Sequence, residues 1–275
     1  MNYLNSSITD LKQLGIDKHQ EYINAKPFPS IVIDNFFNEE ILSQVLADFP
    51  DLSKKEGVIN YDTINEKKLE AKGEKYFSDV TKGFVHFLNS QPVLEFLQEI
   101  TGIKETLVPD PYLVGGGYHE IKPGGLLKVH ADFNKHDMTW LDRRINLLVY
   151  LNKDWEESYG GHFELWDKDM TRSERKVLPI FNRIAIFSTT DFSYHGHPDP
   201  LTCPPDRSRK SIAMYYYSNG RPKHEISDKP HATLFKARAG KENDVTTEPF
   251  TIKDAIREIT PPILFKAAKK VLGRR

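Results

Sequence analysis

Hydrophobic and polar positions follow two different periods along this chain, and the change of period divides it into three parts. Up to about residue 106, apolar residues recur three or four positions apart, which is the spacing of amphipathic helices. One such helix is predicted to begin after Asn38 and to end before Pro50, and another to run from Pro92 to Gly102. Residues 1–106 are therefore expected to form a mostly helical region on the core. The apolar positions of the first of these helices are Ile41, Leu42, Val45, Leu46 and Phe49. A further helix between the two is indicated by Phe77, Val80, Phe84, Phe87 and Leu88.

Between residues 107 and 220 the pattern changes to short runs rich in β-branched and aromatic residues, bounded by Gly, Pro, Asp or Asn. Many short strands without helices between them favour an antiparallel sandwich or barrel over a parallel α/β sheet. A shorter β-branched run at 30–33 precedes them. The clearest runs are 145–151, 162–166, 184–187 and 211–217.

Residues 221–275 are predicted to be an extension that returns to helix between Thr251 and Leu272, interrupted by Pro261 and Pro262. This end of the chain is basic. A solvated helix end with cations near its C-terminus is the simpler interpretation, and contact with an acidic partner or a lipid surface is the alternative. The basic residues are Lys266, Lys269, Lys270, Arg274 and Arg275.

Composition narrows the class of protein. The chain has 275 residues, of which 39% are hydrophobic, and its 38 basic and 39 acidic side chains give a formal charge of −1. Such a balance argues against nucleic acid and anionic membranes as bulk partners. Its single cysteine, Cys203, cannot form an internal disulfide or a thiolate zinc site. With no signal-peptide pattern and no long apolar run, we expect a cytoplasmic protein without an integral membrane segment. The sequence does not indicate an oligomeric state.

Candidate chemistry begins at His130 and Asp132, which lie two residues apart in a strand-like segment. Side chains two apart on a strand point to the same face, so an imidazole and a carboxylate could bind one metal ion. A third ligand is available at His195 or His197, just after another predicted strand. Two histidines and one carboxylate form the facial triad of non-heme iron(II) oxygenases, which leaves open positions on the metal.

Arg209 follows at the start of the apolar strand 211–217. An arginine that points into a barrel is costly unless it meets an anion, and its planar fork matches a carboxylate. Arg207 and Lys210 compete for this role, but strand alternation places Arg209 and Ser211 on one face and Lys210 on the other. A metal triad with one inward arginine suits a dicarboxylate bound to the metal at one end.

The order of these motifs resembles the iron(II)- and 2-oxoglutarate-dependent dioxygenases of the prolyl-4-hydroxylase-like branch. The resemblance runs from about Tyr118 to Tyr217 and implies a mainly β fold with flanking helices, whose core is a double-stranded β-helix, or jelly roll. The motifs that carry it are His130-x-Asp132, the run 144–152, Gly160-Gly161-His162-Phe163-Glu164-Leu165, His195-Gly196-His197-Pro198 and Arg209-x-Ser211.

The resemblance also implies roles for single residues. His130, Asp132 and His195 are similar to the iron ligands of the family, and His195 is favoured over His197 because it precedes the Gly/Pro turn. Arg209, Tyr118 and Asn146 would bind the cosubstrate, with Arg209 and Tyr118 at the distal carboxylate. Residues expected to face the substrate, from the loop after Asp132 and from the distal motif, are Asn134, His136 and His197.

The activity implied is hydroxylation of a C–H bond in a peptidyl or small-molecule substrate, with release of succinate and CO2. The cofactors implied are Fe(II), 2-oxoglutarate and O2, with ascorbate as a reductant. Two other classes stay open on the residues alone. A cupin-type jelly-roll isomerase would keep the triad without needing Arg209, and a non-catalytic small-ligand-binding protein would need neither. The sequence does not identify the substrate.

Overall fold

The computed structural model describes residues 2–225, 229–241 and 243–246 of the chain. Met1–Val245 form one compact unit. Residues up to 106 are less helical than expected, because strands at 30–34, 59–62 and 66–71 lie between the helices and join the sheet. The helix expected between Thr251 and Leu272 lies outside the described residues. Within the described part, no helix combines the length and the apolar character that crossing a membrane would need.

The predicted helices of the first part are present, and their capping residues explain where they begin and end. Asn38 accepts hydrogen bonds from the backbone N–H groups of Glu40 and Ile41, and Ser78 caps its helix in the same way through Thr81. Gly102 ends the last helix in the left-handed conformation, at φ 73°. Sequence periodicity missed the first helix. Within the described residues, the α-helices are α1 (Leu11–Ile23), α2 (Glu39–Ala47), α3 (Asp79–Leu88) and α4 (Gln91–Thr101).

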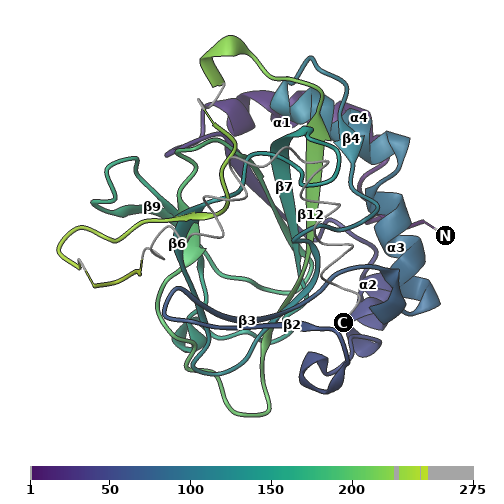
Figure 1. Cartoon of the computed structure of the whole chain (residues 1–275). Coiled ribbons are helices and arrows are strands. Elements are labelled where there is room, and N and C mark those ends of the chain that lie inside the picture. The colour runs from purple at the N-terminus through teal and green to yellow at the C-terminus, as the bar shows by residue number, and fades with distance from the viewer. Residues whose placement is uncertain (1, 226–228, 242, 247–275) are drawn as a thin grey trace, which may run out of the picture. The chain divides into compact units, whose positions relative to one another are not determined.

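The predicted jelly roll is confirmed. One antiparallel sheet runs in the order β1-β10-β7-β12-β5-β3-β6-β11-β8-β9 and curls so that β6 and β9 lie opposite β7 and β12 (Figure 1). β2 pairs with β3, β4 with β12, and β13 with β6. The strands are β1 (Ser30–Asp34), β2 (Ile59–Asp62), β3 (Glu66–Ala71), β4 (Val108–Pro109), β5 (Gly117–Ile121), β6 (Leu126–Ala131), β7 (Asp142–Tyr150), β8 (Phe163–Trp166), β9 (Ser173–Val177), β10 (Arg183–Ser188), β11 (His195–His197), β12 (Arg209–Ser218) and β13 (Leu234–Phe235).

Strand β3 joins the two sides of the roll. Its end at residues 69–71 pairs with β5, while Glu66 and Lys67 pair with β6. The sequence Glu-Lys-Lys-Leu-Glu-Ala consists of good helix formers, so local propensity does not favour a strand here. Pairing on both edges overrides that propensity, and it turns alternate side chains of β3 toward the inside of the roll.

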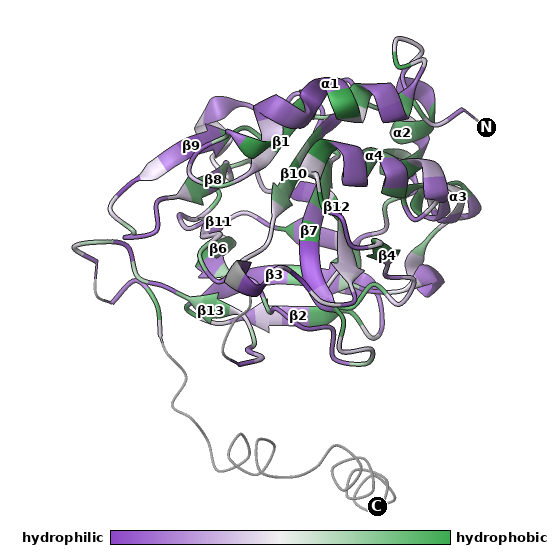
Figure 2. Ribbon diagram, turned by 90° about the horizontal axis from the view of Figure 1, so that it is seen from above, coloured by the Kyte–Doolittle hydropathy of each residue, from purple (hydrophilic) through white to green (hydrophobic). Residues whose placement is uncertain are grey.

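The helices cover the outer face of the sheet half that contains β1, β10, β7 and β12 (Figure 2). One continuous core joins them: Phe84, Phe96 and Leu97 from the helices pack with Leu147 and Met214 from the strands. Tyr216 links the two layers further, because its hydroxyl donates to the carbonyl of Leu88 at 2.8 Å. This layer leaves the opposite, inner face of the sheet free for the site.

Candidate metal centre and cavity

His130, Asp132 and His195 meet inside the roll where β6 and β11 pair, and the pairing of these two strands contains an irregularity. His195 pairs with His130, but His197, two residues later, pairs with Leu127, three residues earlier. The extra residue in β6 is a β-bulge, which resets the alternation so that Leu127 and His130 both line the interior. Gly196 permits this close approach: a Cβ there would lie 2.7 Å from the Leu127 carbonyl oxygen.

The three side chains form the donor set expected from the sequence. Their ligand atoms all lie within 4.8 Å of one another. Nε2 of His130 is 3.6 Å from Oδ1 of Asp132, and Nε2 of His195 is 3.5 Å from Oδ2. Two imidazoles and one carboxylate at this separation suit a divalent iron ion held on one face.

Backbone carbonyls fix both imidazoles in the form that binds metal. Nδ1 of His130 lies 2.8 Å from the carbonyl oxygen of Lys128, and Nδ1 of His195 lies 2.8 Å from that of Ser193. A carbonyl can only accept, so each Nδ1 carries the proton and each Nε2 presents a lone pair to the cavity. Burial also lowers the pKa of His195 to about 4, which keeps its ring neutral at pH 7.

Asp132 is held as a carboxylate by its neighbours. Burial alone would raise its pKa, but Arg143 together with His195 and His130 keeps the pKa well below the ordinary value. Arg143 lies 3.2 Å from Oδ2, and Asn146 donates to the same oxygen at 2.7 Å. Asn146 in turn accepts from Arg143 at 3.0 and 2.8 Å. Asn146, which was expected to bind the cosubstrate, lines the cavity and contacts the carboxylate of the candidate metal site.

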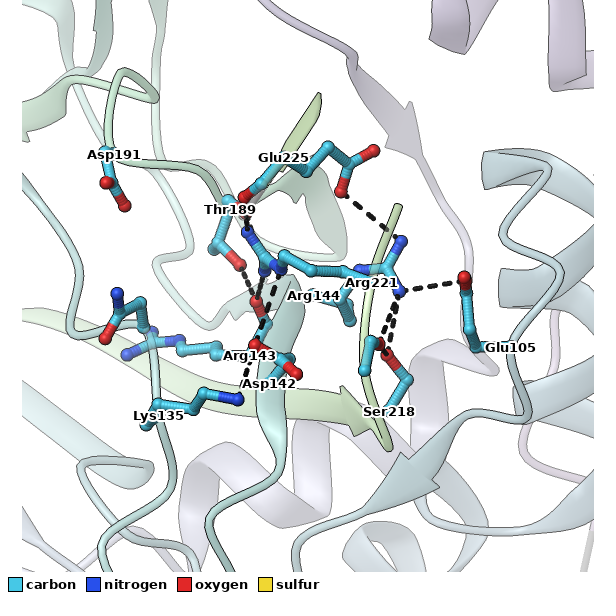
Figure 3. Close-up of polar contacts among 12 residues, drawn as sticks. Glu105, Lys135, Asp142, Arg143, Arg144, Thr189, Asp191, Ser218, Arg221 and Glu225 are labelled. Atoms are coloured by element: carbon cyan, nitrogen blue, oxygen red, sulfur yellow. Dashed lines mark hydrogen bonds and ion pairs between the residues drawn. The ribbon is translucent and has the colours of Figure 1, made fainter. Parts of the chain in front are cut away.

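The start of β7, which carries Arg143, is held by a polar network outside the cavity (Figure 3). Thr189 donates to the carbonyl oxygen of Arg143 at 2.8 Å, and Arg221 donates to that oxygen as well. Lys135 pairs with Asp142 at 2.8 Å, next to Arg143 in the chain. These contacts fix the backbone from which Arg143 reaches Asp132.

The triad opens onto a cavity of about 240 Å³ that also contains Arg209 and Ser211. Arg209 is buried and its Nε donates to the carbonyl oxygen of Gly161 at 2.8 Å. Gly161 has φ +72°, and a Cβ there would meet Arg209 at 3.0 Å and Leu201 at 2.6 Å. The Gly160-Gly161 motif therefore leaves room for the arginine that the sequence singled out.

The competitors of Arg209 lie elsewhere. Arg207 donates to the carbonyl oxygens of Lys153 and Asp154, and Lys210 donates to Ser208 at 2.7 Å. Neither residue lines the cavity. Strand alternation in β12 thus separates Lys210 from Arg209 as the sequence pattern indicated, whereas Arg207 lies before the strand begins.

Tyr118 requires a correction, because the structure does not bring it to the cavity. Its hydroxyl lies 2.9 Å from that of Thr81 in α3, and its ring packs on Phe49 and Phe77. β5 turns the next residue, His119, inward instead, where burial lowers its pKa to about 3. A side chain on the helix-covered face cannot reach a ligand on the inner face of the same sheet.

Asn134 and His136 also differ from the expectation that they face the substrate. The side chain of Asn134 donates to Lys229 O at 3.1 Å and accepts from the backbone N–H of His231 at 2.9 Å. His136 packs edge-on against Tyr217, and its Nδ1 lies 3.2 Å from the backbone nitrogens of Met138 and Thr139. Neither lines the cavity, because both are used to hold loops in place.

Sequence reasoning missed two contributions to the cavity wall. Strand β3 supplies Glu66, Lys68 and Glu70, whose spacing of two residues is the only sequence signal for a shared face. Lys68 pairs with both carboxylates, at 3.4 and 3.7 Å. The second contribution comes from the segment after residue 228, whose strand β13 pairs with β6, so that Phe235 lies opposite His130. Thr233 of this segment lines the cavity.

Comparison with known proteins agrees with this geometry. Residues 116–217 match the family model of the 2OG-Fe(II) oxygenase superfamily, and this range contains the triad, Arg209 and Ser211. The matched range includes the motifs from Tyr118 to Tyr217 on which the resemblance was based.

Solved structures show the same fold at low sequence identity. A prolyl-4-hydroxylase from Pseudomonas putida superposes with a TM-score of 0.54 at 14% identity, covering 75% of this chain and 100% of that one. A prolyl hydroxylase from Trichoplax adhaerens, in complex with a peptide fragment of the hypoxia inducible factor oxygen degradation domain, gives 0.54 at 18% identity, covering 76% and 90%. SnoK, an α-ketoglutarate-dependent carbocyclase of nogalamycin biosynthesis, gives 0.53 at 10% identity, covering 86% and 91%.

Proposed function

We propose that this iron(II)- and 2-oxoglutarate-dependent oxygenase hydroxylates a C–H bond of a small-molecule or peptidyl substrate. In the balanced reaction, one oxygen atom of O2 enters the substrate as a hydroxyl group and the other enters succinate, while 2-oxoglutarate loses CO2. The observation that carries the proposal is the facial triad opening onto a cavity that also holds a buried arginine.

The residues of the chain fit the metal and the cosubstrate. His130, Asp132 and His195 would hold iron(II), since both histidines present Nε2 and Asp132 is ionised. Bound iron supplies the redox chemistry that activates O2 and splits the keto acid. Arg209 would pair with the distal carboxylate, and Ser211 lines the same wall.

The cavity walls contribute in two further ways. Phe163, Phe187 and Leu148 line it with apolar groups near His195, which limits water around the metal. The polar wall of Glu66, Lys68 and Glu70 indicates that the substrate itself carries hydrogen-bonding groups. A screen should therefore begin with polar small molecules and with short peptides.

Of the three solved structures of similar fold described above, two are named as prolyl hydroxylases and the third as a carbocyclase. At these identities the fold does not select among such reactions. Hydroxylation is proposed because it needs nothing beyond the triad, the cosubstrate site and O2. Neither a cupin-type isomerase nor a simple binding protein would require a cosubstrate arginine.

The test uses anaerobically purified protein loaded with iron(II). Adding 2-oxoglutarate should produce the metal-to-ligand charge-transfer band of a chelated keto acid, and admitting O2 should then release succinate. Asp132→Ala and His130→Ala should show neither signal, because the metal loses a ligand that no other group replaces. An unmutated protein that binds iron but gives no band would contradict the proposed function.

A further inference from the structure

His197 differs from the other histidines of the cavity in its hydrogen bonds. His130, His195 and His119 each have a ring nitrogen within 3.1 Å of a backbone carbonyl oxygen. His197 is just as buried, with 4% of its surface exposed, yet within the described residues neither ring nitrogen has a partner. Buried polar groups in folded proteins are almost always paired, so this ring calls for a partner from outside the chain.

The strand places His197 in the same cavity as the triad and Arg209. His195 and His197 are two residues apart on β11, and both line the cavity. A neutral imidazole in this position has one N–H to donate and one nitrogen to accept.

A carboxylate bound by Arg209 could accept hydrogen bonds from a further donor. Nε of the guanidinium donates to the carbonyl oxygen of Gly161, and the terminal nitrogens, which lie next to the Tyr150 side chain, can still donate to a ligand. A carboxylate offers about four lone-pair sites and is held best when several donors converge on it. His197 is a buried side chain of this cavity with an uncommitted ring N–H. The hydroxyl of Tyr150, whose ring centre lies 5.1 Å from Cζ of Arg209, is a second buried donor without a partner among the described residues.

We propose that His197 donates a ring N–H to the distal carboxylate of bound 2-oxoglutarate, the same carboxylate that Arg209 pairs. The inference rests on the proposed function, because it takes 2-oxoglutarate as the ligand. It makes His197 a cosubstrate-binding residue and leaves its second nitrogen to accept from a water molecule or a substrate hydroxyl.

The test compares His197→Phe, which keeps a ring of similar size without nitrogens, with His197→Gln, which keeps a donor. Exposed His86 provides the control variant His86→Leu. Iron affinity and 2-oxoglutarate affinity are measured anaerobically, the latter by the charge-transfer band. The same titrations use 2-oxobutanoate, a keto acid that lacks the distal carboxylate.

We expect His197→Phe to raise the Kd of 2-oxoglutarate about tenfold or more, since a hydrogen bond to a charged group is lost. Its iron affinity and its affinity for 2-oxobutanoate should change less than about twofold, and His197→Gln should recover most of the loss. The melting temperature of the metal-free protein should be unchanged or higher in His197→Phe, because an unpaired polar group is removed. A merely structural histidine would lower it.

Two results would overturn the inference while leaving the proposed function intact. In one, His197→Phe binds 2-oxoglutarate as tightly as the unmutated protein. In the other, it weakens 2-oxoglutarate and 2-oxobutanoate equally, which would place His197 at the keto-acid end. If the unmutated protein gives no band with iron and 2-oxoglutarate, the proposed function fails, and this inference fails with it.

Discussion

Asp132 of the candidate metal triad and Arg143 form a buried ion pair, with 3.2 Å between Oδ2 and Nη2. The guanidinium of Arg143 is also sandwiched between aromatic rings, 4.2 Å from the centre of Phe133 and 3.5 Å from that of Tyr215. Arg143 therefore holds one carboxylate oxygen and leaves the other directed toward His130. This pairing explains how the chain keeps an ionised Asp132 inside a largely apolar roll.

From this pair we predict that Arg143→Met destabilises the metal-free protein by about 3–5 kcal/mol, because it leaves a buried carboxylate without its cation. Bound iron should restore part of the loss, since the metal supplies positive charge at the same carboxylate. Urea unfolding with and without iron(II) measures both effects. The double variant Asp132→Asn/Arg143→Met should be less destabilised than the two single changes added together. Strict additivity would mean that the two side chains do not interact.

Gly196 is predicted to control how closely β6 and β11, the strands that carry His130 and His195, approach each other. In Gly196→Ala the new Cβ would meet the carbonyl oxygens of Leu127 and Lys128 at 2.7 and 2.9 Å, and backbone atoms cannot move aside cheaply. We expect a loss of about 1–3 kcal/mol in stability. Iron affinity should fall as well, because His195 is displaced from His130. Normal iron affinity in a destabilised Gly196→Ala protein would show that the strands can separate without disturbing the triad.

The metal-free protein should lose stability as the pH falls below about 6.5. Burial lowers the pKa of His195 to about 4 and that of His119 to about 3, whereas both would have ordinary values in the unfolded chain. Between these limits the unfolded chain binds protons that the folded protein does not, so stability falls with decreasing pH by up to about 1.4 kcal/mol per unit for each histidine. Chemical denaturation at pH 7 and pH 5 checks this. The variant His119→Phe should flatten the slope, and an unchanged slope would contradict the assignment.

The sequence carried enough information for most of the sheet and for the triad. Strands with long apolar and aromatic runs, such as 147–150 in β7 and 212–217 in β12, could be predicted because burial on both faces favours such runs. Asp132 and His130 could be paired by strand alternation alone. The distal ligand was harder, since His195 and His197 share a face, and the bulge in β6 that separates their environments leaves no mark in the sequence.

The errors concern residues whose position depends on pairing between distant segments. Tyr118 and His119 are adjacent in a strand without clear alternation, so the sequence does not reveal which one faces inward. The strand from Glu66 to Ala71 is composed of helix formers and exists because β5 and β6 pair with it. Asn134 holds a segment nearly a hundred residues further along, which local patterns cannot indicate.

Arg209 yields the prediction that separates cosubstrate binding from metal binding. A buried guanidinium–carboxylate pair loses on the order of 2–5 kcal/mol when one partner is removed, so Arg209→Ala should raise the Kd of 2-oxoglutarate roughly 30-fold or more. Arg209→Lys should recover only part of this loss, because an ammonium cannot make the forked contact. Iron affinity should stay within about twofold in both variants, since Arg209 is not one of the three metal ligands.

Gly161→Ala tests the same site from the other side, without changing any charged group. Its φ of +72° and the contact of 3.0 Å with Arg209 mean that an added methyl group must push the arginine away from its place. We therefore expect weaker 2-oxoglutarate binding, smaller than in Arg209→Ala, again with iron affinity unchanged. The charge-transfer titration measures both variants under identical conditions. If Arg209→Ala binds 2-oxoglutarate normally, the arginine does not hold the cosubstrate; a loss confined to Gly161→Ala would then reflect only the strained backbone.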